Sequence, residues 1–139
     1  MQEVSFEEAL AEIQAKDPRY QRDAYVFVRE ALEFTQKTVT KTGRRRSHHI
    51  SGQELLAGIR DFALQQYGPM AKMLLEEWGV RRCEDFGEIV FNMVEVGWLA
   101  KTKNDSRADF AGGYDFDDAF RKPFLPHGKQ TPAEPRTLI

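Results

Sequence analysis

The sequence has few of the features that mark secreted, membrane-spanning or disulfide-stabilised proteins. Its single cysteine, Cys83, cannot form a disulfide within the chain, which is typical of proteins from a reducing compartment. The N-terminal residues do not show the pattern of a signal peptide. The longest apolar run, around residues 89–91, is far shorter than the roughly 20 residues needed to cross a bilayer. We therefore expect a cytoplasmic protein with no membrane partner.

Motifs of known chemistry are also missing. The sequence holds no Gly-x-Ser-x-Gly nucleophile motif, no phosphate-binding glycine loop and no dinucleotide fingerprint. Its three histidines, His48, His49 and His127, fall in predicted loop or tail segments, whereas catalytic bases usually lie in structured pockets. Cys83 is preceded by two arginines and followed by two carboxylates, whose effects on a thiol oppose each other. We name no catalytic residue, expect no cofactor, and favour a non-enzymatic role.

Two groups of acidic residues are candidates for a metal site. Asp85, Glu88, Asn92 and Glu95 share one face of a predicted helix, but metal sites in helical bundles draw ligands from several helices. We interpret these four as a solvated acidic face. The aspartates between residues 105 and 118 lack the glycine that a calcium loop requires at its sixth position. The sequence therefore predicts no metal ligand.

Composition favours one folded domain followed by a tail. Hydrophobic residues make up 41% of the chain and charged residues 30%, which is typical of a protein with a single core. We predict a helical domain over residues 1–120. Residues 121–139 hold four of the six prolines and few apolar side chains, which predicts an extended or disordered tail.

Helix start and stop signals punctuate the predicted domain. Two Ser-x-x-Glu sequences, at residues 5–8 and 51–54, predict capping boxes at helix starts. Pro18 and Pro69 predict two further helix starts, and Gly68 predicts a helix end in the left-handed conformation. The hydrophobic spacing predicts helices over residues 5–16, 18–38, 51–67, 69–78 and 84–96.

A change of period after Gly97 predicts the β structure of the fold. Two short segments, residues 98–103 and 106–110, flank the turn-forming pair Asn104-Asp105. We therefore predict a mainly α fold, with four to five helices followed by a short β-hairpin. Three helices and a hairpin in this order are typical of a winged-helix domain, whose third helix enters the DNA major groove.

Basic residues of one loop and of the predicted hairpin form a candidate site for an anion or a nucleic acid. The loop precedes the helix start at Ser51, where free amides favour an anion, although a solvated basic loop explains the same residues. The acidic third helix and the net charge of −2 argue against groove binding, so nucleic acid is the second hypothesis. The candidate residues are Arg44, Arg45, Arg46, His48, His49, Lys101, Lys103 and Arg107.

Large aromatic residues crowd the region after the last predicted helix. Some would pack the hairpin onto the helices, and any that stay exposed would form a patch for a partner. We therefore favour a protein–protein interaction or regulatory module whose partner is another protein or a second copy. An enzyme with a site not visible in the sequence is the third hypothesis. The candidate partner surface is Trp98, Phe110, Tyr114, Phe116 and Phe120.

Five strings of the sequence resemble a family of short uncharacterised bacterial proteins. They are SGQELLAGIR at residues 51–60, YGPMA at 67–71, WGV at 78–80, DFGEIVFN at 85–92 and GYDF at 113–116. The resemblance covers roughly residues 5–120 and leaves out the tail. The family has no assigned activity, so the resemblance implies a grouping and no catalytic residue.

Overall fold

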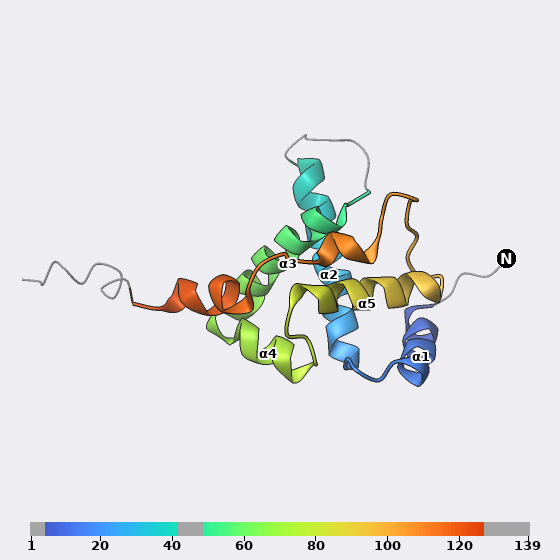
Figure 1. Cartoon of the computed structure of the whole chain (residues 1–139), viewed down its shortest axis with the longest axis horizontal. Helices are drawn as coiled ribbons and strands as arrows, with labels where there is room; N and C mark the ends of the chain where they lie inside the picture. The colour runs from blue at the N-terminus through green and yellow to red at the C-terminus, as the bar shows by residue number, and fades with distance from the viewer. Residues whose placement is uncertain (1–4, 42–48, 127–139) are drawn as a thin grey trace, which may run out of the picture.

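The computed structural model describes residues 5–41 and 49–126. The described residues form five α-helices, drawn in Figure 1, and no β-strand occurs among them. The prediction of a mainly helical fold is confirmed. The elements are α1 (Phe6–Lys16), α2 (Arg22–Lys41), α3 (Gly52–Tyr67), η1 (Gly68–Met70), α4 (Ala71–Glu77), α5 (Cys83–Glu95), η2 (Arg107–Phe110), η3 (Asp117–Arg121) and η4 (Lys122–Phe124).

The long helix α2 organises the core because α1, α3 and α5 all pack against it. Its closest approach is to α3, where a Cβ on Gly58 would lie 1.8 Å from the Thr35 hydroxyl oxygen. Thr35 is buried and donates its hydroxyl to the carbonyl oxygen of Ala31, so its polar group needs no partner on α3. Gly58 therefore sets how closely the two helices pack.

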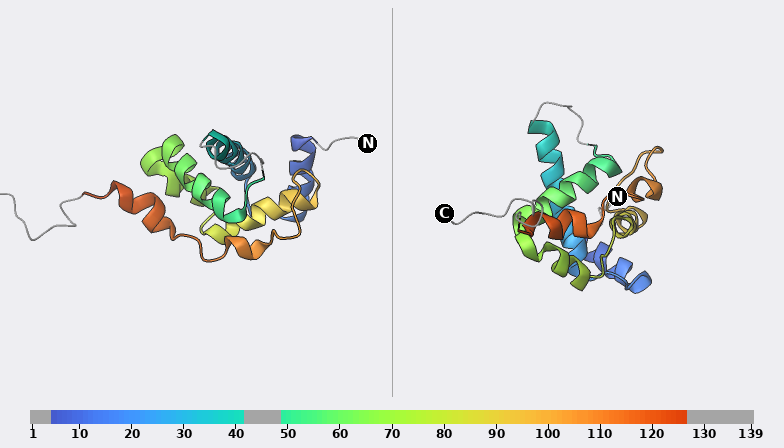
Figure 2. Two further views of the ribbon diagram at one scale, coloured as in Figure 1. Left: turned by 90° about the horizontal axis from the view of Figure 1, so that it is seen from above. Right: turned by 60° about the vertical axis from the view of Figure 1, so that its left-hand side comes forward.

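Buried side chains from every α-helix join one hydrophobic core. Tyr25 and Phe27 of α2 are almost fully buried, as are Ile59 of α3, Leu75 of α4 and Phe86 of α5. The chain after α5 covers this core from outside: η2 packs on α5 and α3, and η3 packs on α4 and α3 (Figure 2). The described residues thus form one helical unit with a covering segment.

Most helix boundaries follow the predicted signals. Both capping boxes are present, at Ser5 and at Ser51, and Gly68 ends α3 with φ of 53°. The predicted helix start at Pro18 is wrong, because α2 begins at Arg22. The carboxylate of Asp17 accepts hydrogen bonds from the backbone and the guanidinium of Arg19, and these bonds hold a turn before the helix.

The predicted β-hairpin over residues 98–110 is wrong. Asp105 Oδ2 accepts the Thr102 N–H at 2.9 Å, which closes a loop instead of a two-stranded turn. Ser106 and Asp109 then form a capping box that begins the 3₁₀ helix η2, so the second predicted strand is helical. With no hairpin, the described residues have no wing, and the winged-helix interpretation is wrong as well.

Only part of the predicted tail lies among the described residues. Residues 121–126 complete η3 and form η4, and residues 127–139 lie outside the described residues. The basic loop was predicted over residues 40–49, but Thr40 and Lys41 belong to α2. Of the rest of that loop, only His49 lies among the described residues. Within the described residues, no helix is both long enough and apolar enough to cross a membrane.

Candidate functional site

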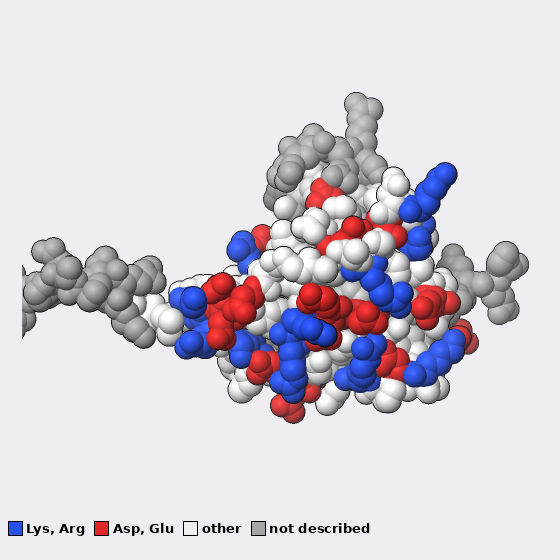
Figure 3. Space-filling model, in the orientation of Figure 1, with Lys and Arg blue, Asp and Glu red and all other residues white. Residues whose placement is uncertain are grey.

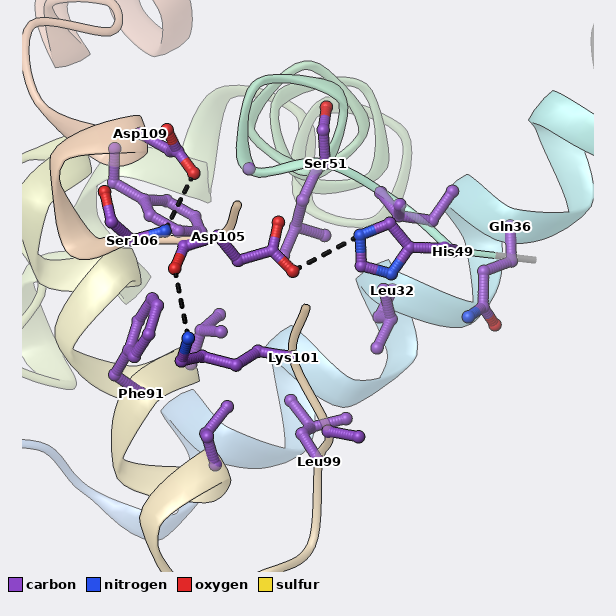
Figure 4. A pocket seen from close by; sticks show the side chains of 17 residues that line it. Leu32, Gln36, His49, Ser51, Phe91, Leu99, Lys101, Asp105, Ser106 and Asp109 are labelled. Atoms are coloured by element: carbon purple, nitrogen blue, oxygen red, sulfur yellow. Dashed lines mark hydrogen bonds and ion pairs between the residues drawn. The ribbon is translucent and has the colours of Figure 1, made fainter. Parts of the chain in front are cut away.

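A cavity of about 270 Å³ lies between α2, the start of α3, α5 and the loop that precedes η2 (Figure 4). Each of these four segments contributes to its wall, so residues far apart in the sequence meet there. Its floor is apolar and comes mainly from helix faces that pack on the core. The apolar lining consists of Leu32, Ile50, Leu55, Val90, Phe91, Val94, Leu99, Ala100 and Phe110.

Two glycines allow η2 to close one side of the cavity. A Cβ on Gly52 would lie 2.8 Å from Asp109 Cβ, and a Cβ on Gly87 would lie 2.9 Å from Phe110 Cβ. Real Cβ atoms essentially never approach so closely, so Phe110 reaches its buried position only because both helices lack a side chain there. The glycines of α3 and α5 thus place the η2 wall of the cavity.

Charged side chains lie at the mouth of the cavity. Asp105 Oδ2 accepts hydrogen bonds from the backbone amide and hydroxyl of Thr102, and His49 Nε2 lies 3.3 Å from the same oxygen. The Thr102 amide is the main cause that lowers the pKa of Asp105. Lys101 Nζ donates to the carbonyl oxygens of Thr102 at 3.1 Å and of Asp105 at 3.4 Å. Figure 4 shows Lys101 and His49 approaching Asp105 from different directions.

Asp109 adds a second carboxylate to the cavity wall. Its Oδ2 accepts the Ser106 N–H at 3.0 Å, and its carbonyl oxygen accepts the side-chain amide of Gln53 at 2.7 Å. Throughout residues 5–41 and 49–126, Asp109 forms no ion pair, and Lys101 forms none either. The mouth therefore holds one cation and one anion that no opposite charge of the described protein neutralises.

The chemistry of this arrangement is that of binding. The Ser51 hydroxyl accepts the Glu54 N–H, and the Ser106 hydroxyl accepts the Ala108 N–H, so both are engaged at helix starts. Cys83 is buried away from this cavity, and burial raises the pKa of its thiol. Among the residues that the structure describes, no three His, Cys, Asp or Glu side chains gather to hold a metal ion.

The predicted basic site is divided by the structure. His49 and Lys101 both line the cavity. Arg107 lies over the Phe91 ring and pairs with carboxylates of α5, and Lys103 is exposed on the loop. The residues Arg44, Arg45, Arg46 and His48 lie outside the described residues.

The predicted aromatic surface contributes largely to the core. Phe110, Phe116 and Phe120 are 3%, 4% and 1% exposed, so their rings are not available to a partner. Tyr114 donates its hydroxyl to the Leu56 carbonyl oxygen, and Trp98 packs against a ring of α1. These contacts attach the chain after α5 to the helices.

The acidic face of α5 was expected to be solvated, but much of it is paired. Asp85 accepts the Tyr20 hydroxyl at 2.6 Å, and Asn92 donates to Asp17 at 2.9 Å. Glu88 pairs with Arg19 at 3.1 Å and with Arg107 at 3.3 Å. Figure 3 shows acidic and basic side chains lying side by side over this face. The residues thus attach the α1–α2 turn and η2 to α5.

The helical spacing placed only the helix residues Leu32, Leu55, Val90 and Val94 of the apolar lining on inward faces, whereas Leu99, Ala100 and Phe110 were assigned to the predicted hairpin. The sequence also did not indicate that these faces leave a cavity. Leu55, Val90 and Val94 fit a helical stripe, but a stripe does not indicate whether the opposing segment fills the space. Asp109 was considered only as a calcium ligand. The available signal was the Ser-x-x-Asp spacing from residue 106, which predicts a helix start.

Comparison with known proteins gives no match: no family model, no curated protein and no solved structure matches the chain. The resemblance to a family of short bacterial proteins therefore stays a prediction.

Proposed function

We propose that the protein is a regulatory module that binds a small molecule in the cavity between α2, α3, α5 and the loop before η2. The observation that carries this proposal is an apolar cavity of about 270 Å³ with unpaired charges of both signs at its mouth. Ligand sites in proteins combine an apolar lining with a few convergent polar groups in the same way. The volume lies just below the roughly 300–1,000 Å³ of typical ligand pockets, which favours a small ligand.

A regulatory role is supported by the segments that form the cavity walls, because one of them is an exposed loop and another is a helix of the core. Residues 99–110 form one wall through Leu99, Lys101 and Asp109, and this loop returns to the core only at Phe110. A ligand that touches this loop and α2 together stabilises their arrangement by its binding free energy. Most of the loop is exposed, so a partner protein that binds it would bind the occupied and the empty protein with different affinities.

Nucleic-acid binding has weaker support. Arg107 faces Glu88 and Glu95, so its charge is already neutralised within the protein. Lys101 lies at the cavity, whereas Lys103 is exposed on the loop, and both are followed by the carboxylate of Asp105. A phosphate backbone needs several cations on one surface, and the described residues do not provide that arrangement.

A thermal-shift screen with a cavity-filling variant tests the proposal. Val94→Phe places a larger side chain into the cavity, and Val96→Phe makes the same change at a half-buried residue of the helix end that does not line it. The full chain and both variants are screened against a panel of small metabolites by scanning fluorimetry. We expect at least one compound to raise the Tm of the wild type and of Val96→Phe, and not that of Val94→Phe.

Two results would contradict the proposal. One is a panel in which no compound raises the Tm of the wild type. The other is a compound that raises the Tm of Val94→Phe as much as that of the wild type, because its site then lies elsewhere.

A further inference from the structure

We infer that the ligand of this cavity is a free α-amino acid with an aliphatic side chain, bound as its zwitterion. This inference rests on the proposed function and names the class of its ligand. It depends on three features of the site: the size of the cavity, the chemistry of its floor, and the two opposite charges at its mouth.

The floor of the cavity selects an aliphatic body. Leu32 of α2, Leu55 of α3, Val94 of α5 and Leu99 of the loop all line it. Transfer of an aliphatic side chain from water to such a surface is favourable, and it becomes more favourable with each buried CH₂ group. At about 270 Å³ the cavity has room for a whole amino acid with a branched side chain, and it lies below the usual volume of sites for larger ligands.

The mouth of the cavity provides a partner for each charge of a zwitterion. Among the described residues, Lys101 Nζ donates only to backbone carbonyl oxygens, so none of their carboxylates pairs with it and its positive charge is available to a ligand carboxylate. Within residues 5–41 and 49–126, the Asp109 carboxylate accepts only the Ser106 N–H, so its negative charge is available to an ammonium group. Charge-assisted hydrogen bonds of this kind are about twice as strong as neutral ones.

A ligand with one charge fits less well. A simple carboxylate would pair with Lys101 while the carboxylates of Asp105 and Asp109 repel it. A simple amine would pair with Asp109 while the Lys101 ammonium repels it. Asp105 is less available than Asp109, because the backbone and hydroxyl of Thr102 and the His49 ring already surround its Oδ2. Only a ligand with both charges gains from both unpaired groups.

Four compounds that differ by one group each test the inference on the full chain at neutral pH. Leucine carries all three features, isocaproate lacks the amine, isoamylamine lacks the carboxylate, and glycine lacks the aliphatic body. Affinities are measured by calorimetry, and amide chemical shifts in an NMR titration locate the binding site. We expect leucine to bind at least about tenfold more tightly than each of the other three, because it forms two charge-assisted contacts.

Two variants separate the contributions of the charges. Lys101→Met keeps an unbranched side chain but removes the ammonium group, and Asp109→Asn keeps an oxygen that accepts the Ser106 N–H. Each variant is expected to weaken leucine binding about tenfold. Isoamylamine should bind Lys101→Met at least as tightly as it binds the wild type. Isocaproate should likewise bind Asp109→Asn at least as tightly as it binds the wild type. Lys103→Met, on the same loop and outside the cavity lining, is the matched control and should bind leucine like the wild type.

The outcomes distinguish this inference from the proposed function. If isocaproate or isoamylamine binds at the cavity as tightly as leucine, the zwitterion inference is overturned while the proposed function stands. If Lys103→Met weakens leucine binding as much as Lys101→Met does, binding reflects the charge of the loop, and the inference is again overturned. If none of the four compounds changes the amide chemical shifts of the cavity residues, and no metabolite of the screen raises the Tm, both the inference and the proposed function fail.

Discussion

Asp17 is the residue on which the junction between α1, α2 and α5 depends. Its carboxylate accepts two hydrogen bonds from the Arg19 guanidinium, at 2.8 Å and 2.7 Å, and one from the Asn92 amide at 2.9 Å. Asn92 also donates to the hydroxyl of the buried residue Tyr25, so the contacts of one carboxylate reach from a surface turn into the core. These hydrogen bonds, with that of Arg19 the largest cause, hold the pKa of Asp17 well below its usual range.

The depressed pKa of Asp17 predicts a loss of stability in acid. Because the folded state favours the carboxylate, this contribution is present above the unfolded pKa of about 4 and is lost as the pH falls toward the folded pKa. We expect Asp17→Asn to lower the free energy of unfolding by about 1 kcal/mol at neutral pH, an amount discounted for the exposure of Arg19. Urea unfolding measured between about pH 2 and pH 7 should therefore show a shallower pH dependence for the variant.

Asp23→Asn provides the control for this prediction. Asp23 is an exposed carboxylate in the first turn of α2 and forms no ion pair with the described residues. Its substitution should leave the pH dependence of the wild type in place. Equal slopes for the wild type and Asp17→Asn would show that the Asp17 contacts contribute nothing to stability.

At the scale of the element, local signals determine helix boundaries where a side chain satisfies a backbone amide. The Ser-x-x-Glu sequences at residues 5–8 and 51–54 predicted two helix starts that the structure confirms. Residues 106–109 follow the same rule with Asp in place of Glu. This helix start was not predicted, because the turn-forming pair Asn104-Asp105 favoured a hairpin over the same residues. A β-hairpin requires backbone hydrogen bonds between its two strands. Here the Thr102 N–H donates to the Asp105 side chain, so it does not bond to an opposite strand. The sequence pattern of residues 98–110 could therefore not decide between a β-hairpin and a loop followed by a 3₁₀ helix.

The capping box of η2 predicts a coupling between a helix start and the cavity. Ser106→Ala removes the hydroxyl that accepts the Ala108 N–H, so it should lower the free energy of unfolding by about 1 kcal/mol. The same change loosens the first turn of η2, which carries Asp109 in the cavity wall, although the backbone N–H of residue 106 that Asp109 accepts is kept. We therefore expect weaker binding of any cavity ligand, measured by calorimetry, in addition to the loss of stability.

Ser5→Ala is the matched control, since it removes an equivalent cap from α1. Ser5 does not line the cavity. A similar loss of stability with unchanged ligand affinity is expected for this variant. Equal losses of affinity in the two variants would mean that global stability, and not the position of η2, controls binding.

At the scale of the whole molecule, the core could be predicted from the sequence and the cavity could not. The stripes of α2, α3 and α5 predicted which side chains face inward, and these side chains do form one core. Whether inward faces meet or leave a space depends on backbone separation, which close contacts at Gly52, Gly58 and Gly87 determine. A glycine in a helix does not indicate which segment will approach it. The sequence analysis grouped Lys101 and His49 in one candidate basic site, but the sequence does not indicate that both line a cavity.

The arrangement of the molecule predicts where a ligand will reduce local opening. A ligand in the cavity contacts α2, the start of α3, α5 and the loop before η2, and it does not contact α1 or α4. Local openings that expose the cavity must release the ligand, so binding makes them rarer, by about tenfold at a ligand concentration ten times the Kd. Hydrogen exchange followed by mass spectrometry should therefore show slower exchange in residues 49–55 and 99–110. Exchange in the turn between α4 and α5 should change much less, because its hydrogen bonds, such as that of Val80 N–H to the Leu75 carbonyl oxygen, open independently of the cavity. Uniform protection of all helices would indicate that openings are global and that the loop carries no separate response to the ligand.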